Sequence, residues 1–137
     1  MNAKQYLNQS YKLNELIESN QQELADLNLL KASISGIDYS KDKVQVSPSG
    51  DASFVKVVEK IVELEEAIEA DTERMLELKL EIRNVINLVV DNEEKLLLKY
   101  RYLNFLSWEE ICDRMNVSIR TAHRIHSEAL ESVVVPE

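Results

Sequence analysis

An apolar residue recurs at every seventh position between residues 52 and 90. The recurring positions are Phe54, Ile61, Ile68, Met75, Ile82 and Val89, and the companion positions are Val57, Leu64, Leu78 and Val85. Only Asp71 interrupts the companion set. A sustained seven-residue repeat is typical of a long helix whose apolar seam packs against another helix. The pattern predicts a helix from about Ala52 to Val90, which would be roughly 55 Å long.

A second long helix is expected near the N-terminus, from about Ala3 to Ala32. Its apolar positions follow a helical spacing that Ser10 and Asn20 interrupt. The segment 33–51 between the two helices contains both glycines and several serines, which favours a loop. Because one helix cannot bury its own seam, we expect the two helices to form an antiparallel hairpin. Asp71 then either fixes the register as a buried polar residue or lies exposed at a mismatch, and both interpretations remain open.

The segment after residue 90 carries the signals of shorter helices. Asp91 and Asn92 interrupt the seven-residue pattern and can cap an apolar helix over 93–104. Ser107, with Glu110 three residues later, matches a capping box and predicts a helix from Trp108 to Met115. The residues of the 93–104 helix expected to cover its neighbours are Leu96, Leu97, Tyr100 and Leu103.

A turn of three residues leads into the last predicted helix. Asn116 tolerates a left-handed backbone, and Ser118 is suited to cap a helix that runs to about Val133. Two short helices joined by such a turn form a helix-turn-helix unit. The small side chain of Ala122 allows the two helices to cross closely. The expected inward positions are Ile111, Met115, Val117, Ala122, Ile125, Ala129 and Val133.

The outer face of this unit supplies the candidate DNA-binding residues. A recognition helix enters the major groove with its N-terminal part, so Arg120, Thr121 and Arg124 are candidates for contacts to base edges. Ser118 and Arg114 are candidates for contacts to phosphate, together with the amides of the first helical turn. The full candidate set is Arg114, Ser118, Arg120, Thr121, His123, Arg124 and Ser127.

Composition limits the classes of protein that the chain can be. It has 137 residues with 25 acidic and 16 basic side chains, a formal net charge of −9, yet residues 114–127 contain no acid. That balance argues against nonspecific nucleic-acid binding over the whole surface and leaves room for one local basic face. Two glycines and two prolines disfavour a sheet protein. The single cysteine excludes an intrachain disulfide, and no stretch approaches the roughly 20 apolar residues of a membrane span.

The remaining residues with chemical potential are expected to have structural roles. Trp108 is interpreted as an anchor of the core, and Cys112 as a small side chain within the helix-turn-helix. His123 and His126 lie three residues apart, which is too few ligands for a metal site. His126 is expected on the flank of the buried stripe, bonded to a neighbouring helix. No phosphate-binding glycine loop or catalytic grouping is present, so we expect neither an enzyme nor a cofactor.

The C-terminal stretch "LSWEEICDRMNVSIRTAHRIHSEAL" resembles the region-4 helix-turn-helix of bacterial sigma factors, which reads the promoter −35 element. With "KYRYLNF" before it and "KQYLNQSYKLNELIESN" near the N-terminus, nearly the whole chain resembles small phage and prophage proteins of Gram-positive bacteria. That group is classed with late-transcription regulators, which implies DNA binding. One difference lies at the start of the last helix, where the sigma pattern has a dense run of basic and polar residues and this chain has Ile119, Arg120 and Thr121. The apolar residue can contact a thymine methyl group. Alternatively, the difference indicates another target sequence or a surface that binds protein.

The sequence therefore predicts an all-α protein with two regions. Residues 1–90 would form the coiled-coil-like hairpin, for oligomerisation or partner binding, and residues 91–137 a three-helix domain of the sigma region-4 type. The leading hypothesis is a cytoplasmic, phage-type transcription regulator that binds double-stranded DNA, forms a homo-oligomer (a dimer is favoured) through its helical region, and has no membrane partner. The alternatives are an adaptor that docks on RNA polymerase or another phage protein, and a DNA-packaging recognition subunit.

Overall fold

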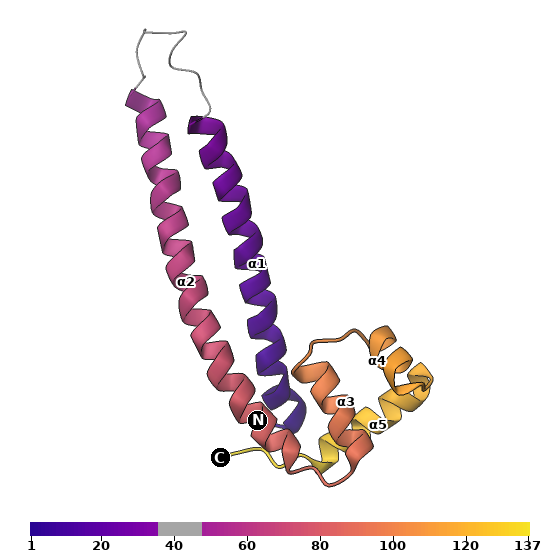
Figure 1. The fold of residues 1–137 in the computed structure, drawn as a ribbon. Helices are drawn as coiled ribbons and strands as arrows, with labels where there is room; N and C mark the ends of the chain where they lie inside the picture. Colours follow the sequence, from indigo (N-terminus) through magenta and orange to yellow (C-terminus); the bar gives the residue numbers. More distant parts are fainter. Residues whose placement is uncertain (36–47) are drawn as a thin grey trace. The chain divides into compact units, whose positions relative to one another are not determined.

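The computed structural model describes residues 1–35 and 48–137, and this part of the chain is all-α (Figure 1). Two long helices run side by side in opposite directions and are followed by three short ones. The predicted fold class is therefore confirmed. The helices are α1 (Ala3–Ser35), α2 (Pro48–Asn87), α3 (Asn92–Tyr102), α4 (Trp108–Met115) and α5 (Ile119–Ser132). None of these helices is long and apolar enough to cross a membrane.

The helix boundaries differ from the sequence-based ones at both ends of α2. The predicted loop 33–51 was too long, because α1 continues to Ser35 and α2 begins at Pro48; residues 36–47 lie outside the described residues. At the other end α2 stops at Asn87, short of the predicted Val90. The backbone N–H of Val89 donates to Ile86 O at 3.0 Å, a tighter turn than the α-helix makes. The last apolar position of the seam thus lies in a turn and is still buried.

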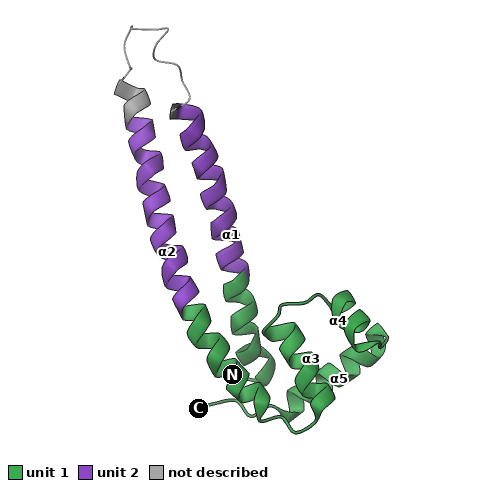
Figure 2. Cartoon of the chain, viewed as in Figure 1, with its two compact units in different colours: residues 1–14, 74–137 green, residues 15–73 purple. Residues whose placement is uncertain are grey.

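The chain divides into two compact units, shown in green and purple in Figure 2. The first unit contains residues 1–14 and 74–137, and the second unit contains residues 15–73. Each unit includes a part of both long helices. The sequence-based boundary at residue 90 falls inside the first unit, because the end of α2 shares a core with α3 and α5.

The first unit is built around a core to which four helices contribute. Its residues come from the start of α1, the end of α2, α3 and the end of α5. The buried members are Tyr6, Leu7, Leu78, Ile82, Val85, Ile86, Val89, Leu98, Tyr102, Ala129 and Val133. The long-helix seam is therefore covered by a further layer of helices in this unit.

Helix α3 has buried residues on two sides, which the sequence pattern did not reveal. Leu97 belongs to a second cluster with α4 and α5, whereas Leu98 and Tyr102 belong to the first core. Leu96, one of the residues expected to cover its neighbours, is 40% exposed and belongs to neither cluster. A helix of 11 residues between two clusters needs apolar side chains on two faces, so its pattern does not follow one stripe.

Ser10 is a buried polar residue in the first unit, not merely an interruption of the α1 pattern. Its side chain is fully buried, and its hydroxyl lies 3.0 Å from Leu7 O and 2.9 Å from Tyr102 O. Hydrogen bonding of this kind removes most of the cost of burying a hydroxyl. Ser10 therefore joins α1 to the last residue of α3.

The second unit is a two-helix arrangement with a less complete core. Among its described side chains, only Ile17 and Ile61 are buried. The other seam positions of α1 and α2 are half-buried, namely Leu24, Leu27, Phe54, Val57, Leu64 and Ile68. Asp71 is also half-buried, so it is neither the fully buried nor the fully exposed residue that the sequence left open.

Candidate nucleic-acid interface

Helix α4 begins and ends where the sequence predicts. The Ser107 hydroxyl accepts a hydrogen bond from Glu110 N at 3.2 Å, and the Glu110 carboxylate accepts one from Ser107 N at 3.1 Å, which completes the capping box. The helix ends at Asn116, whose φ of 55° and ψ of 50° confirm the predicted left-handed turn. The N–H of Val117 then donates to Cys112 O at 3.1 Å and closes the turn.

Helix α5 begins directly after this turn. Ser118 is its N-cap, as predicted, and accepts a hydrogen bond from Thr121 N at 3.2 Å. The Ser118 hydroxyl also donates to the Thr121 hydroxyl oxygen at 3.0 Å. Thr121 is half-buried, so it is less accessible than the exposed first turn predicted from the sequence. These two candidates are in direct contact with each other.

A second apolar cluster holds α4 and α5 against α3. Its buried members are Leu97, Ile111, Ala122 and Ile125, and Met115 and Val117 pack against it. Ala122 is fully buried, as its predicted place at the helix crossing requires. The predicted inward stripe is thus confirmed, and the opposite face of α5 is left for solvent.

That opposite face carries the candidate arginines. Arg120, Arg124 and Ser127 are all exposed, and their spacing of four and three residues places them along one side of α5. Arg114 is exposed on α4, and its guanidinium carbon lies 5.6 Å from the centre of the Tyr100 ring. His123 is also exposed. The structure therefore brings cationic and polar groups to the surface of α5 without burying them.

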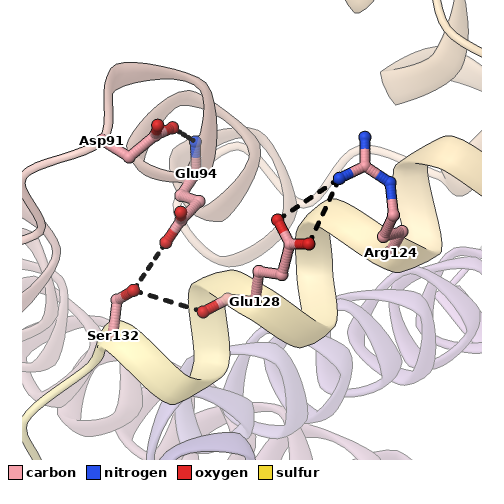
Figure 3. Close-up of polar contacts among 5 residues, drawn as sticks. All are labelled: Asp91, Glu94, Arg124, Glu128 and Ser132. Atoms are coloured by element: carbon pink, nitrogen blue, oxygen red, sulfur yellow. Dashed lines mark hydrogen bonds and ion pairs between the residues drawn. The ribbon is translucent and has the colours of Figure 1, made fainter.

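The basic character of α5 is confined to its first half. Arg124 forms an ion pair with Glu128, with Nη1 3.2 Å from Oε1 (Figure 3). One turn further, the Ser132 hydroxyl donates to the Glu94 carboxylate at 2.6 Å, while the Asp91 carboxylate caps α3 beside it. With Glu131 of α5 itself, four carboxylates thus lie along the second half of the helix. A polyanion would meet favourable charge only near the N-terminal half of α5.

Trp108 links the three short helices. Its ring centre lies 4.6 Å from that of His123 and 4.9 Å from that of His126, both on α5. From α3, the Arg101 guanidinium lies 4.8 Å from the Trp108 ring and 4.7 Å from the Tyr11 ring, and it donates to Leu106 O at 3.0 Å. The predicted role of Trp108 as an anchor is confirmed.

His126 is buried and hydrogen-bonded, as predicted. Its Nε2 lies 2.8 Å from the Tyr102 hydroxyl. Burial lowers the pKa of His126 to about 4, helped by the positive charges of Lys4, Arg101 and His123. Burial likewise raises the pKa of Tyr102 to about 12. At neutral pH the imidazole is therefore uncharged, so His126 supports the fold and adds no positive charge to the α5 surface.

A shallow hollow lies where α4 meets the start of α5. It has a volume of about 530 Å³ and is lined by Glu109, Cys112, Asp113 and Ile119. Ile119 is 49% exposed there. In the described part of the chain, no three His, Cys, Asp or Glu side chains gather in a way that could hold a metal ion.

One family model, described as "Protein of unknown function (DUF1492)", matches residues 33–133. The chain belongs to the DUF1492 family. The matched region contains α3, α4 and α5 in full, and with them every candidate DNA-binding residue. Neither a curated protein nor a solved structure matches the chain. Membership of the DUF1492 family carries no assigned activity.

Two residues that contact the candidate site, Glu128 and Arg101, were not identified from the sequence. Glu128 lies four residues after Arg124, a spacing at which a helix brings side chains together, so the ion pair could have been predicted. Arg101 gave no local signal, because its neighbours Tyr11 and Trp108 are distant in the sequence or on another helix. Only the fold reveals that contact.

Proposed function

We propose that this protein is a phage-type transcription regulator that binds double-stranded DNA through α5 and catalyses no reaction. The single observation that carries the proposal is the exposure of Arg120 and Arg124 on one face of α5, a capped helix that follows α4 after a short turn. The resemblance to sigma region 4 supports the same conclusion. On this proposal the protein acts in the cytoplasm of a bacterial host.

Each candidate residue has a role that follows from its chemistry. Arg120 lies in the first turn of α5, where side chains reach furthest into a major groove, and its planar guanidinium can bond the two acceptors of guanine. Arg124 lies one turn later. To contact DNA, its guanidinium must leave the ion pair with Glu128. Ser127, a further turn along, is suited to a phosphate oxygen.

The flanking residues would fix the position of α5 on the duplex. The N–H groups of the first turn of α5 carry the positive end of the helix dipole and favour a phosphate. Arg114 adds a positive charge from α4. His123 is held against Trp108 and would make a short polar contact beside the arginines. Because Ser118 and Thr121 already bond each other, their hydroxyls contribute less than their amides.

The proposal is tested by titrating the full chain with double-stranded fragments of host and prophage DNA at several salt concentrations. Contacts to phosphate make the logarithm of the binding constant fall linearly with the logarithm of salt concentration. We expect the double variant Arg120→Ala with Arg124→Ala to weaken binding at least tenfold. Its salt slope should also become shallower, by about one for each phosphate that an arginine no longer neutralises.

A matched control removes the same charge elsewhere in the first unit. Arg74 and Arg83 are exposed on α2, and their double alanine variant leaves α5 intact. We expect this variant to bind nearly as tightly as the unaltered chain. If both double variants lose affinity equally, the effect is one of net charge and the assignment of α5 is wrong.

A protein partner is the second candidate function, and the hollow beside Ile119 favours it. An exposed apolar side chain between Glu109 and Asp113 suits a partner that offers an apolar contact and a basic group. RNA polymerase or another phage protein would fill this role. Recovery of polymerase by the full chain, with no detectable DNA binding, would favour an adaptor over a DNA-binding regulator.

Oligomeric state separates the remaining alternatives. A dimeric regulator would present two recognition helices to two half-sites. A DNA-packaging recognition subunit would instead form rings. Sedimentation of the full chain distinguishes the two, because a ring contains many more subunits than a dimer.

A further inference from the structure

The seam between the two long helices is open in the second unit. A hollow of about 310 Å³ lies between α1 and α2, with Leu27, Leu64 and Ala67 among its lining residues. Ala67 contributes only a methyl group, so α2 leaves space where a larger side chain would fill the groove. Glu23, Lys60 and Glu63 complete the lining. The lining of the hollow thus combines three apolar and three charged side chains.

Two exposed leucines extend this hollow along α1. Leu16 and Leu30 each lie seven residues from Glu23, which is two helical turns, so all three follow one line on the helix surface. Leu16 is 49% exposed and Leu30 is 48% exposed. We call Leu16, Leu27, Leu30, Leu64 and Ala67, with Glu23, Lys60 and Glu63, the groove face.

We propose that the groove face binds the groove face of a second copy of this chain, which turns two hairpins into a four-helix bundle. Such bundles bury the seams that a single pair of helices leaves half-exposed. The apolar side chains that would enter the hollow of one copy are Leu16 and Leu30 of the other. Dimer formation is independent of the proposed DNA binding, because the groove face contains no residue of α5.

The size of the groove face suits a dimer. In the second unit α1 contributes residues 15–35 and α2 contributes residues 48–73. The shorter of these segments is roughly 30 Å long, and the two helices side by side are roughly 20 Å wide. Each copy therefore offers a face of roughly 600 Å², or about 1,200 Å² for the pair, which is the lower end for a specific interface. A smaller partner, such as a single peptide helix, would cover only part of it.

The groove face carries charges of both signs, with Lys60 beside Glu23 and Glu63. In a twofold dimer, a residue i that contacts residue j of the other copy does so twice. Lys60 of one copy can therefore face a glutamate of the other, and the reverse contact forms as well. Lys60 has a long, weak contact within its own chain, 3.4 Å from Glu63, with both side chains more than two-thirds exposed.

The proposal is tested by measuring the mass of the full chain in solution by light scattering and sedimentation over a range of concentrations. We expect a dimer at micromolar concentration. The variant Leu16→Lys with Leu30→Lys should raise the dissociation constant at least tenfold, because two charges would enter an apolar contact. Both leucines are half-exposed in the single hairpin, so helicity measured by circular dichroism should not change.

Two control variants place new lysines on other surfaces, and the second of them matches the two added charges of the test variant. Leu29 is 71% exposed and adjacent to Leu30 but points away from the seam, so Leu29→Lys should leave the dimer intact. Leu76→Lys with Leu80→Lys alters two exposed leucines of α2 in the first unit, and it should also remain a dimer. A chain that is monomeric throughout, or that dissociates only in a control variant, would overturn the proposal.

Discussion

The two compact units use the same pair of helices but bury them to different extents. In the first unit the α2 seam residues Met75, Leu78, Ile82 and Val85 are all less than a tenth exposed. In the second unit the equivalent residues of the same helix are half-buried, with Ile61 as the exception. The apolar repeat is equally regular in both parts. The difference therefore lies in what covers the seam.

Coverage by α3 and α5 explains the closed core of the first unit. Leu98, Tyr102, Ala129 and Val133 are buried in one core with the long helices there. Two helices alone present too little surface to enclose a core, and stability in small domains comes from the area removed from water. In the first unit, the short helices of the same chain cover the seam of the two long helices. In the second unit, we propose that a second copy of the chain covers it.

The sharpest test of this difference compares two isoleucines at equivalent seam positions. Ile82 is fully buried in the first unit, and Ile68 is half-buried in the second unit. We expect Ile82→Ala to lower the free energy of unfolding by about 3–4 kcal/mol, and Ile68→Ala by about 1–2 kcal/mol. Urea unfolding followed by circular dichroism measures both. Equal losses would mean that the two units are equally closed.

Acid should destabilise the first unit, because the buried His126 lies in it. The pKa of His126 is about 4 in the folded chain and about 6.5 when unfolded, so the unfolded state binds a proton first as pH falls. Stability is therefore full above about pH 6.5 and declines towards pH 4, by up to about 3 kcal/mol. In His126→Gln this component should disappear. Parallel stability curves for the two proteins, followed by Trp108 fluorescence, would rule out His126 as the cause.

Replacing the two polar residues that interrupt the apolar pattern of α1, Ser10 and Asn20, should also cost more stability in the first unit than in the second. Ser10 is fully buried and bonds the carbonyl groups of Leu7 and Tyr102. Asn20 is half-buried in the second unit. We expect Ser10→Ala to cost about 1–2 kcal/mol, because a buried carbonyl group loses its partner. Asn20→Ala should change stability by less than about 0.5 kcal/mol. Thermal unfolding of both variants makes the comparison.

The smallest effect is expected on the exposed surface of the first unit. The Arg124–Glu128 pair is more than half exposed on both sides, so Glu128→Gln should alter stability by less than about 0.5 kcal/mol. If DNA takes the place of Glu128, the same variant should bind DNA about twofold to fivefold more tightly, since Arg124 is released. Glu131→Gln, on the same helix, is the control for charge alone. Equal gains in both variants would show that Glu128 has no special relation to Arg124.

Local signals were sufficient to predict α4 and α5. Ser107, Glu110, Asn116 and Ser118 each act through neighbours within four residues, and the predicted caps and turn are all present. The boundaries of α2 and the buried face of α3 were not predictable in this way. They depend on contacts between distant segments, such as Ser10 with Tyr102, which no local pattern contains.

In the candidate DNA-binding surface, too, local features were predictable and contacts between helices were not. Exposure of Arg120 and Arg124 follows from the inward stripe of Ala122, Ile125 and Ala129 and was predicted. The contact between Arg101 and Trp108 depends on how α3 crosses α4, so the sequence alone did not indicate it.

The most direct test of the account is an unbiased selection of host and prophage DNA fragments by the full chain. We expect enrichment of fragments that share a short sequence, and loss of that enrichment in the variant that replaces both Arg120 and Arg124 by alanine. Recovery of no preferred sequence by the unaltered chain, or the same sequence with and without the two arginines, would contradict the proposed role of α5.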